Sequence, residues 1–280
     1  MTEVSTCIIS YNQEKYIGQA IESALLQKCS FESEIIICDD ASTDETRKII
    51  LSYVSKFPGK IKAHFAEQNI GMLKNWEKAL KLCTGKYIAL LEGDDFWTDE
   101  NKLQKQYQIL ENNSDYTISF TNANIQYENG KLGFDAYVTL KNEEYTTVDL
   151  MKYNFIPTGS VLMRNNISNT FFHAAYFKSP FADWIVHVLN SKFGKIHFLN
   201  EFTTTYRVHS AGVWGGTNEE KQLKNKLKAI DCIGEIVTDR QLKFWAKQSR
   251  KEILQNICAL YQQQKSYLDY LIYRIKLLLN

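Results

Sequence analysis

The N-terminal part of the chain alternates short apolar runs with segments of helical period. The apolar runs cover residues 4–9, 34–38, 61–65 and 87–91, and the helical segments between them cover residues 16–26, 43 onward and 71–82. Polar loops follow the apolar runs. This order is typical of βαβ units, in which consecutive strands lie parallel and the helices cross over the sheet. We therefore predict an α/β fold with a parallel sheet.

The pattern becomes mixed beyond Asp99. We predict a helix at 100–110, a strand at 116–127, a second strand after the hairpin signal Asn129-Gly130, a strand at 158–164, a helix at 183–193 and short strands at 195–199 and 203–208. The strand at 116–127 and the strand after Asn129-Gly130 would form an antiparallel supplement to the sheet. From Glu219 onward the pattern is almost entirely helical.

Composition narrows the possible classes. A chain of 280 residues can bury one main core, and a formal charge of +1 argues against a nucleic-acid partner. The six cysteines contain no Cys-x-x-Cys pair, which is typical of reduced residues in a cytoplasmic protein. There is no basic segment before an apolar stretch at the N-terminus, and no apolar window reaches the roughly 18 residues of a membrane span. We expect neither a cleaved signal nor a spanning helix.

Two neighbouring carboxylates follow the apolar run 87–91. The run continues into Glu92-Gly93-Asp94-Asp95, which places acids at the carboxyl end of a buried strand, where open α/β sheets bind ligands. Hard cations such as Mg²⁺ or Mn²⁺ prefer oxygen ligands, commonly together with substrate phosphates. We predict a divalent cation site here, and a solvated turn with two acids is the alternative.

A second set of acids follows the run 34–38. Asp39, Asp40 and Asp44 lie on the loop after this strand. Asp44 is best placed to cap the next helix, and Asp40 is the better ligand for the donor groups of a nucleotide base and ribose. The sequence contains neither Gly-x-Gly-x-x-Gly nor a P-loop, so a metal would have to carry the charge of a bound diphosphate.

Five blocks of the sequence resemble family 2 glycosyltransferases. They are residues 9–12 (Ile-Ser-Tyr-Asn), 39–44 (Asp-Asp-Ala-Ser-Thr-Asp), 69–71 (Asn-Ile-Gly), 84–95 and 206–214, in this order. The resemblance covers about residues 4–215. It implies a Rossmann-like, mixed, mostly parallel sheet with helices on both faces, the A-type glycosyltransferase fold. It also implies a catalytic domain at 1–216, a helical extension at 217–280, and a metal-dependent reaction with inversion at the anomeric carbon.

The resemblance also implies roles for individual residues. The donor-binding residues would be Ser10, Tyr11, Asn12, Asp40, Asn69, Gly71, Asn75 and Asp94, the ligands of Mn²⁺ or Mg²⁺ would be Asp94, Asp95 and His209, and the catalytic base would be Asp183. Two positions depart from the pattern of the family. Glu92 stands where many relatives have aspartate, and Ala182 precedes Asp183 where relatives usually have glutamate or glycine.

The resemblance implies transfer of a single sugar from a nucleoside-diphosphate sugar to a hydroxyl of a glycan or lipid-linked acceptor, in cell-surface polysaccharide biosynthesis. No Gln-x-x-Arg-Trp segment accompanies the other motifs, which argues against processive polymerisation. Two alternatives stay open. One is a nucleotide-sugar-binding module that has lost catalysis, as Glu92 and Ala182 would allow. The other is a metal-independent glycoside hydrolase that uses a pair of acids.

Two segments near the C-terminal part have alternative interpretations. Gly212, Trp214, Gly215 and Gly216 would either close over a bound donor or form an ordinary mobile loop. Residues 267–279 are apolar with basic residues and too short to span a bilayer. They would either pack on the preceding helices, form a homodimer contact, or lie in a membrane interface as a peripheral contact at the inner face of the membrane.

Overall fold

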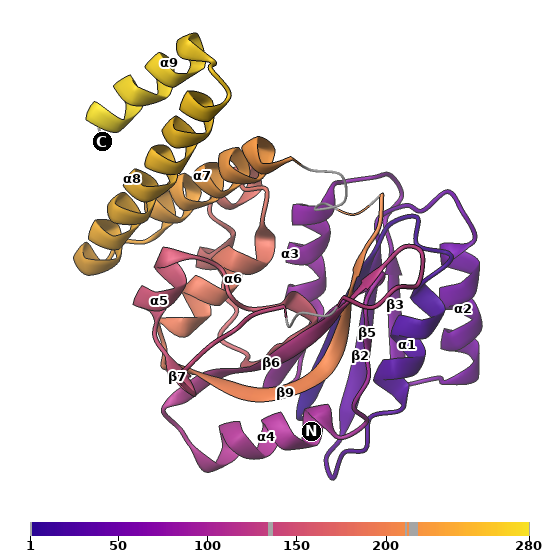
Figure 1. The fold of residues 1–280 in the computed structure, drawn as a ribbon. Helices are drawn as coiled ribbons and strands as arrows, with labels where there is room; N and C mark the ends of the chain where they lie inside the picture. The colour runs from indigo at the N-terminus through magenta and orange to yellow at the C-terminus, as the bar shows by residue number, and fades with distance from the viewer. Residues whose placement is uncertain (1, 134–136, 211, 213–217, 280) are drawn as a thin grey trace. The chain divides into compact units, whose positions relative to one another are not determined.

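The computed structural model of the chain describes residues 2–133, 137–210, 212 and 218–279 (Figure 1). The chain forms two compact units. The first comprises Met1–Tyr145, Phe155–Ser168 and Asn190–Val208, and the second comprises Thr146–Asn154, Asn169–Leu189 and His209–Asn280. These units are defined by which residues pack together. The predicted division into a catalytic domain at 1–216 and an extension at 217–280 was defined by sequence motifs instead, and it remains a prediction.

The first unit is built on one sheet with the order β3-β2-β1-β4-β8-β6-β9-β5, and β7 pairs with β9. Its parallel part consists of β1 (Val4–Ser10), β2 (Ser33–Asp39), β3 (Ile61–Phe65) and β4 (Tyr87–Glu92). All residues of β1 are buried, as are all but the first of β2, because helices cover both faces of these strands. The four predicted strands of the parallel sheet are confirmed.

The other part of the sheet is mixed. It contains β5 (Phe96–Trp97), β6 (Tyr116–Tyr127), β7 (Glu144–Tyr145), β8 (Leu162–Arg164) and β9 (Lys195–Val208). Strand β8 pairs antiparallel with β4 and β6, whereas β6 and β9 pair in parallel. The predicted antiparallel supplement is therefore correct for the pairing of β6 with β8 and wrong for the pairing of β6 with β9, which is parallel because the chain crosses back to the same end of the sheet between the two strands.

Three predicted strands differ in detail. The segments 195–199 and 203–208 form one strand, β9, in which register shifts opposite Thr121 and Asn122 accommodate the polar interruption. The segment 158–164 begins with a 3₁₀ turn at Thr158–Ser160 before β8. After Asn129-Gly130 the chain turns, with Gly130 at φ 78°, but among the described residues it makes only the bridge between Gln126 and Leu132.

Helices cover both faces of this sheet (Figure 1). The core on one face joins β1, β2 and β4 to α1 (Ile17–Leu25), α2 (Thr46–Lys56) and α4 (Lys102–Asn112). On the opposite face lies α3 (Met72–Leu82), whose Asn75 Nδ2 donates to the Cys38 carbonyl at 2.9 Å. The predicted α/β class, with a mixed sheet between layers of helices, is confirmed.

The second unit is helical. It contains α5 (Thr147–Lys152), most of α6 (Ala182–Ser191), α7 (Glu219–Ile236), α8 (Arg240–Gln263) and α9 (Tyr267–Leu278), with 3₁₀ turns at Asn169–Phe172 and Tyr176–Lys178. Trp184 Nε1 donates to the Leu150 carbonyl at 2.8 Å, and Ser249 Oγ donates to the Met151 carbonyl, so α5 is held by α6 and α8. Within the described part of the chain, no helix is both long and apolar enough to cross a bilayer.

Candidate functional site

The register of the parallel strands aligns their carboxyl ends. Ser10 on β1 lies opposite Asp39 on β2, and Ile9 lies opposite both Cys38 and Glu92 on β4. The loops that follow these strands therefore leave the sheet at the same edge. Ser10, Tyr11, Asn12, Asp40, Asp94 and Asp95, which were predicted separately from three loops, all lie at or just beyond this edge. Open α/β sheets bind ligands at such an edge.

Side chains of the β1 and β2 loops hold one another. The Asp39 carboxylate is buried and accepts hydrogen bonds from Ser10 Oγ at 3.0 Å and from the Ser42 amide at 3.0 Å. Asn12, at φ 52°, donates its amide N–H to Ser42 Oγ at 2.9 Å and accepts from the Thr43 amide through Oδ1 at 2.8 Å. Ser10 and Asn12 thus shape the edge, while the Tyr11 side chain is 46% exposed and available for stacking on a ligand.

The predicted donor ligand Asp40 is deeply buried. It is 2% exposed, and its two carboxylate oxygens accept the amide N–H groups of Ile70 at 2.8 Å and Gly71 at 2.9 Å. Asn69 Oδ1 also accepts from the Gly71 amide at 3.1 Å, and Gly71 has φ 88°, a conformation that suits glycine. The predicted residues Asp40, Asn69 and Gly71 therefore form one structural unit that connects the β2 loop to the start of α3.

Replacing Asp40 with asparagine should lower the free energy of unfolding by about 1–3 kcal/mol, because the amide group would leave a buried backbone N–H without its acceptor. Urea unfolding measures this loss. The control is Asp44→Asn, which changes a carboxylate of the same loop that also accepts two amides, from Thr46 and Glu14, but is partly exposed, so its loss should be smaller because water can replace a lost bond. An Asp40→Asn protein that unfolds like the parent protein would contradict the buried bidentate arrangement.

The two carboxylates after β4 have different environments. Asp95 is 2% exposed, and its Oδ1 accepts the amide N–H of Arg207 from β9 at 2.8 Å. Burial, together with the neighbouring charge of Asp94, raises the pKa of Asp95 well above its usual range. Asp94 is partly exposed. A Cβ atom at Gly159 would lie 3.0 Å from Thr204 Oγ1 and 3.8 Å from Asp95 Oδ2, so this glycine packs closely against β9 next to the buried carboxyl group.

The structure adds Arg207 to the predicted residues. Its guanidinium donates to the Asp94 carbonyl and to Gln19 Oε1, and it lies 5.0 Å from the ring centroid of Tyr16 and 4.4 Å from that of Phe96. This places a cation beside the Asp94-Asp95 pair. Arg207 belongs to the block 206–214 that resembles the family, at the end of a predicted strand. The sequence did not indicate its contacts, because its partners Asp94 and Gln19 lie on distant segments.

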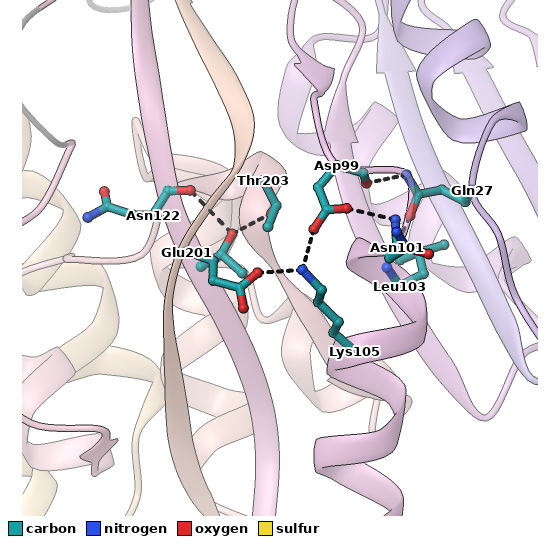
Figure 2. A network of polar contacts seen from close by, with 9 residues as sticks. Gln27, Asp99, Asn101, Leu103, Lys105, Asn122, Glu201 and Thr203 are labelled. Carbon is teal, nitrogen blue, oxygen red and sulfur yellow. Dashed lines mark hydrogen bonds and ion pairs between the residues drawn. The ribbon is translucent and has the colours of Figure 1, made fainter.

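Polar contacts also hold an earlier part of β9, at Glu201 and Thr203 (Figure 2). Lys105 on α4 bridges Asp99 at 2.8 Å and Glu201 at 2.6 Å, and Gln27 Nε2 donates to the Asp99 carbonyl at 2.8 Å. Thr203 Oγ1 on β9 is bonded to Thr121 Oγ1 on β6 at 2.7 Å. These contacts connect α4 and β6 directly to the strand that carries Arg207, and Gln27, just after α1, supports Asp99.

The oxygen-rich pair Asp94-Asp95 fits a divalent cation. Two adjacent carboxylates, one of them buried with a raised pKa, repel each other when both are ionised, and a bound cation would relieve this repulsion. Among the residues that the structure describes, however, no three His, Cys, Asp or Glu side chains gather as a metal site. The protein side chains would thus supply a partial ligand set, as is usual where substrate phosphates complete the coordination of Mg²⁺.

Asp183 and His209 belong to the second unit. Asp183 lies in the first turn of α6 and is partly exposed, and its Oδ2 accepts a hydrogen bond from Asn154 Nδ2 at 2.9 Å. Asn154, which no motif singled out, therefore orients this carboxylate. One turn later, burial lowers the pKa of His187 to about 4, so its imidazole is neutral near pH 7. His209 is 8% exposed, and its carbonyl accepts from the Gly212 amide at 3.0 Å.

The roles of Asp183 as base and His209 as metal ligand stay predictions. The predicted closing segment lies mostly outside the described residues, which include Gly212 but not Trp214, Gly215 or Gly216.

An α/β sheet with carboxylates at its carboxyl edge defines a ligand-binding protein of the open-sheet class. A family profile described as Glycosyl transferase family 2 matches residues 5–184, and the chain belongs to this family. An uncharacterized protein of Mycobacterium tuberculosis is 36% identical to this chain over 211 residues, which are 75% of this chain and 60% of that protein. The chain thus spans about 60% of the length of this relative.

A relative with a named activity agrees with this assignment, and two solved structures share the fold. The β-1,3-glucosyltransferase WfaP of Escherichia coli is 32% identical over 236 residues, which cover 84% of this chain and 88% of WfaP. The crystal structure of S. aureus TarS with UDP matches 90% of this chain and 71% of that chain with a TM-score of 0.62 and 20% identity. The mannosyltransferase PcManGT of Pyrobaculum calidifontis, in complex with GDP-Man and Mn²⁺, matches 98% of this chain and 83% of its own with a TM-score of 0.61 and 11% identity.

Proposed function

We propose that this chain is an inverting, metal-dependent glycosyltransferase that moves a single sugar from a nucleoside-diphosphate sugar to a hydroxyl of a lipid-linked glycan. The observation that carries the proposal is the shared sheet edge, at which the β1, β2 and β4 loops present Tyr11, the loop organised by Asp40, and the pair Asp94-Asp95. An aromatic side chain, a polar loop and two carboxylates suit the base, the ribose and the metal-bound diphosphate of a donor.

The chemistry requires one proton acceptor and stabilisation of the leaving diphosphate. In our proposal, Asp183 takes the proton from the acceptor hydroxyl while the acceptor oxygen forms a bond to the anomeric carbon and the bond to the diphosphate breaks. Asn154 orients Asp183 through its hydrogen bond. Asp94, with Asp95 behind it and His209 as a further candidate ligand, would hold Mn²⁺ or Mg²⁺. A bound cation would neutralise the charge that develops on the diphosphate.

The names of the relatives support the donor and acceptor classes. WfaP and WfgD of Escherichia coli are named as glucosyltransferases that use UDP-Glc and act on GlcNAc-diphosphoundecaprenol. TarS was solved with UDP and with UDP-GlcNAc, and PcManGT with GDP-Man and Mn²⁺. The names of WfaP and WfgD favour transfer to a lipid-linked acceptor. Our proposal places this transfer in polysaccharide biosynthesis at the inner face of the membrane. Family membership favours transfer over the glycoside hydrolase alternative.

A second candidate is a nucleotide-sugar-binding module without catalysis. Glu92 supports this alternative. It stands where many relatives have aspartate, and its longer side chain changes the position of the first carboxylate before the Asp94-Asp95 pair. It is partly buried, and its charge is among the causes that raise the pKa of the half-buried Tyr206, after desolvation of the tyrosine itself. Glu92 therefore lies close to the end of β9 rather than far from the site.

Sugar transfer tests the proposal. Purified protein should transfer sugar from one of the uridine, guanosine or thymidine diphosphate sugars to a diphosphoundecaprenol-linked acceptor, and EDTA should abolish the transfer. The same donor with Mn²⁺ should raise the melting temperature, because saturation at about 100 times Kd adds about 2.7 kcal/mol of stability. A thermal shift without transfer would support the binding module, and neither effect with any donor would overturn the proposal.

A further inference from the structure

Helix α9 exposes a continuous apolar stripe. The exposed fractions are 75% for Tyr267, 73% for Leu268, 55% for Leu271, 43% for Ile272, 49% for Ile275, 74% for Leu278 and 82% for Leu279. With about 100° between successive residues of a helix, these side chains cover one sector of about 140°. No residue of α9 is buried. Contiguous apolar surfaces of this kind mark sites of interaction.

The stripe remains exposed although α9 already packs on a neighbour within its unit. Its opposite face carries Asp269, Tyr270, Tyr273 and Leu277, which are only partly exposed, and the Tyr273 ring lies 5.6 Å from that of Tyr261 on α8. The Asp269 carboxylate accepts from Ser266 Oγ at 2.7 Å at the start of the helix. Packing against the preceding helices was one interpretation of the sequence. It explains how one face of α9 is covered, and the apolar stripe on the other face remains exposed.

The charges around the stripe are basic. On the same helical projection, Arg274 borders one side of the stripe and Lys276 borders the other, and both are exposed. Asp269 is the single acid of α9 and lies on the face toward α8. An apolar stripe flanked by exposed basic residues is the pattern of a helix that lies in the interface of an anionic membrane, with its long cationic side chains reaching the headgroups.

We propose that α9 binds the surface of an anionic lipid bilayer through this stripe. A helix of 12 residues is about 18 Å long, which is shorter than the roughly 30 Å hydrocarbon core, so it would lie along the surface. A second copy of the chain fits less well, because a two-fold symmetric contact centred on the stripe would bring Arg274 and Lys276 close to their own counterparts. The inference concerns binding alone and is tested without any measurement of transfer.

Vesicle flotation of the full chain tests the proposal. The protein should float with vesicles of phosphatidylglycerol and phosphatidylcholine, and the bound fraction should fall on raising the salt to about 1 M, where the Debye length is about 3 Å. The variant Leu271→Ser/Ile275→Ser/Leu278→Ser should lower binding at least about tenfold, since burying each of these side chains contributes more than about 1.4 kcal/mol. Arg274→Gln/Lys276→Gln should reduce binding to anionic vesicles and the salt dependence together.

The matched control is Leu26→Ser/Leu51→Ser/Phe193→Ser, which removes three apolar side chains of the first unit that are 66%, 45% and 63% exposed. This variant should float like the parent protein, and both triple variants should keep the parent's circular dichroism melting curve. Absence of flotation with anionic vesicles would overturn the proposal. So would equal losses in both triple variants, or an oligomer in sedimentation that needs the α9 stripe and does not float.

Discussion

Replacing Asp183 with asparagine is expected to lower the turnover of sugar transfer by about 10²- to 10⁴-fold, which is the usual contribution of a general base. The amide retains the size of the side chain and an oxygen that accepts from Asn154 Nδ2, as Asp183 does at 2.9 Å, but it cannot take a proton. Donor binding should therefore remain nearly unchanged, because the donor residues that we propose lie on the β1, β2 and β4 loops and at the start of α3, and Asp183 is not among them. Steady-state kinetics and a donor titration measure the two effects separately.

The control for this prediction is Asp231→Asn, which makes the same chemical change on α7 of the same unit, where Asp231 pairs with Arg250. Its turnover should equal that of the parent protein. If Asp183→Asn kept normal turnover, Asp183 would not be the base. If it lost donor binding and turnover to the same extent, its role would be in binding rather than in proton transfer.

Replacing Asp94 with asparagine is expected to abolish the stabilisation by Mn²⁺ plus donor and to lower transfer by about 10³-fold, since a cation contributes several kcal/mol to stabilising the leaving diphosphate. Asp94 is the more accessible of the two acids. Thermal melting with and without Mn²⁺ and donor, followed by transfer assays, measures both effects. The control is Glu67→Gln, which removes an exposed acid after β3 and should change neither quantity.

Asp95→Asn should change the pH dependence of the free energy of unfolding of the metal-free protein. The pKa of Asp95 in the folded state lies above its unfolded value of about 3.9, so its contribution to stability is present below that pH and is lost as the pH rises through the raised pKa. Asparagine keeps an oxygen acceptor for the Arg207 amide and carries no charge. In EDTA, the free energy of unfolding of the variant should therefore exceed that of the parent at pH 8, and the advantage should shrink toward pH 4.

Urea unfolding at both pH values measures this difference. Equal stabilities of Asp95→Asn and the parent at all pH values would contradict a buried carboxyl with a raised pKa. In Mn²⁺ plus donor, the parent should gain more stability at pH 8 than at pH 5, because a carboxylate must be deprotonated to bind a cation. A normal Mn²⁺ response of Asp94→Asn, together with its loss in Asp95→Asn, would assign the metal to the buried acid instead.

The sequence predicted the long, regular elements and the short strand β8, within the segment 158–164, but missed other short elements. Strands β1 to β4 and helices α1 to α4 are each long enough to show a period, and turn residues bound them. Strand β5 has two residues and α5 has six, which is less than the window in which a period can be recognised. Strand β9 was predicted as two strands because Asn200 and Glu201 interrupt its apolar pattern, whereas pairing with β6 continues through this interruption.

The same limit applies to the candidate site. Asp40, Asp94 and Asp95 could be assigned to one edge because parallel strands end together. Their hydrogen-bond partners could not be predicted, since Ile70 and Gly71 follow Asp40 by about one βα unit and Arg207 is on a strand far along the chain. For the same reason the sequence did not reveal that Asn154 orients Asp183.

The sequence by itself determined the α/β class, the edge of the sheet that carries the carboxylates, and membership of the family, because all three depend on local periodicity and on motifs at strand ends. The tertiary structure decided that Asp95 is buried while Asp94 reaches solvent, that Asp40 binds backbone amides, and that one face of α9 stays uncovered. Burial and hydrogen-bond partners depend on contacts between segments distant in sequence, which neither composition nor spacing records.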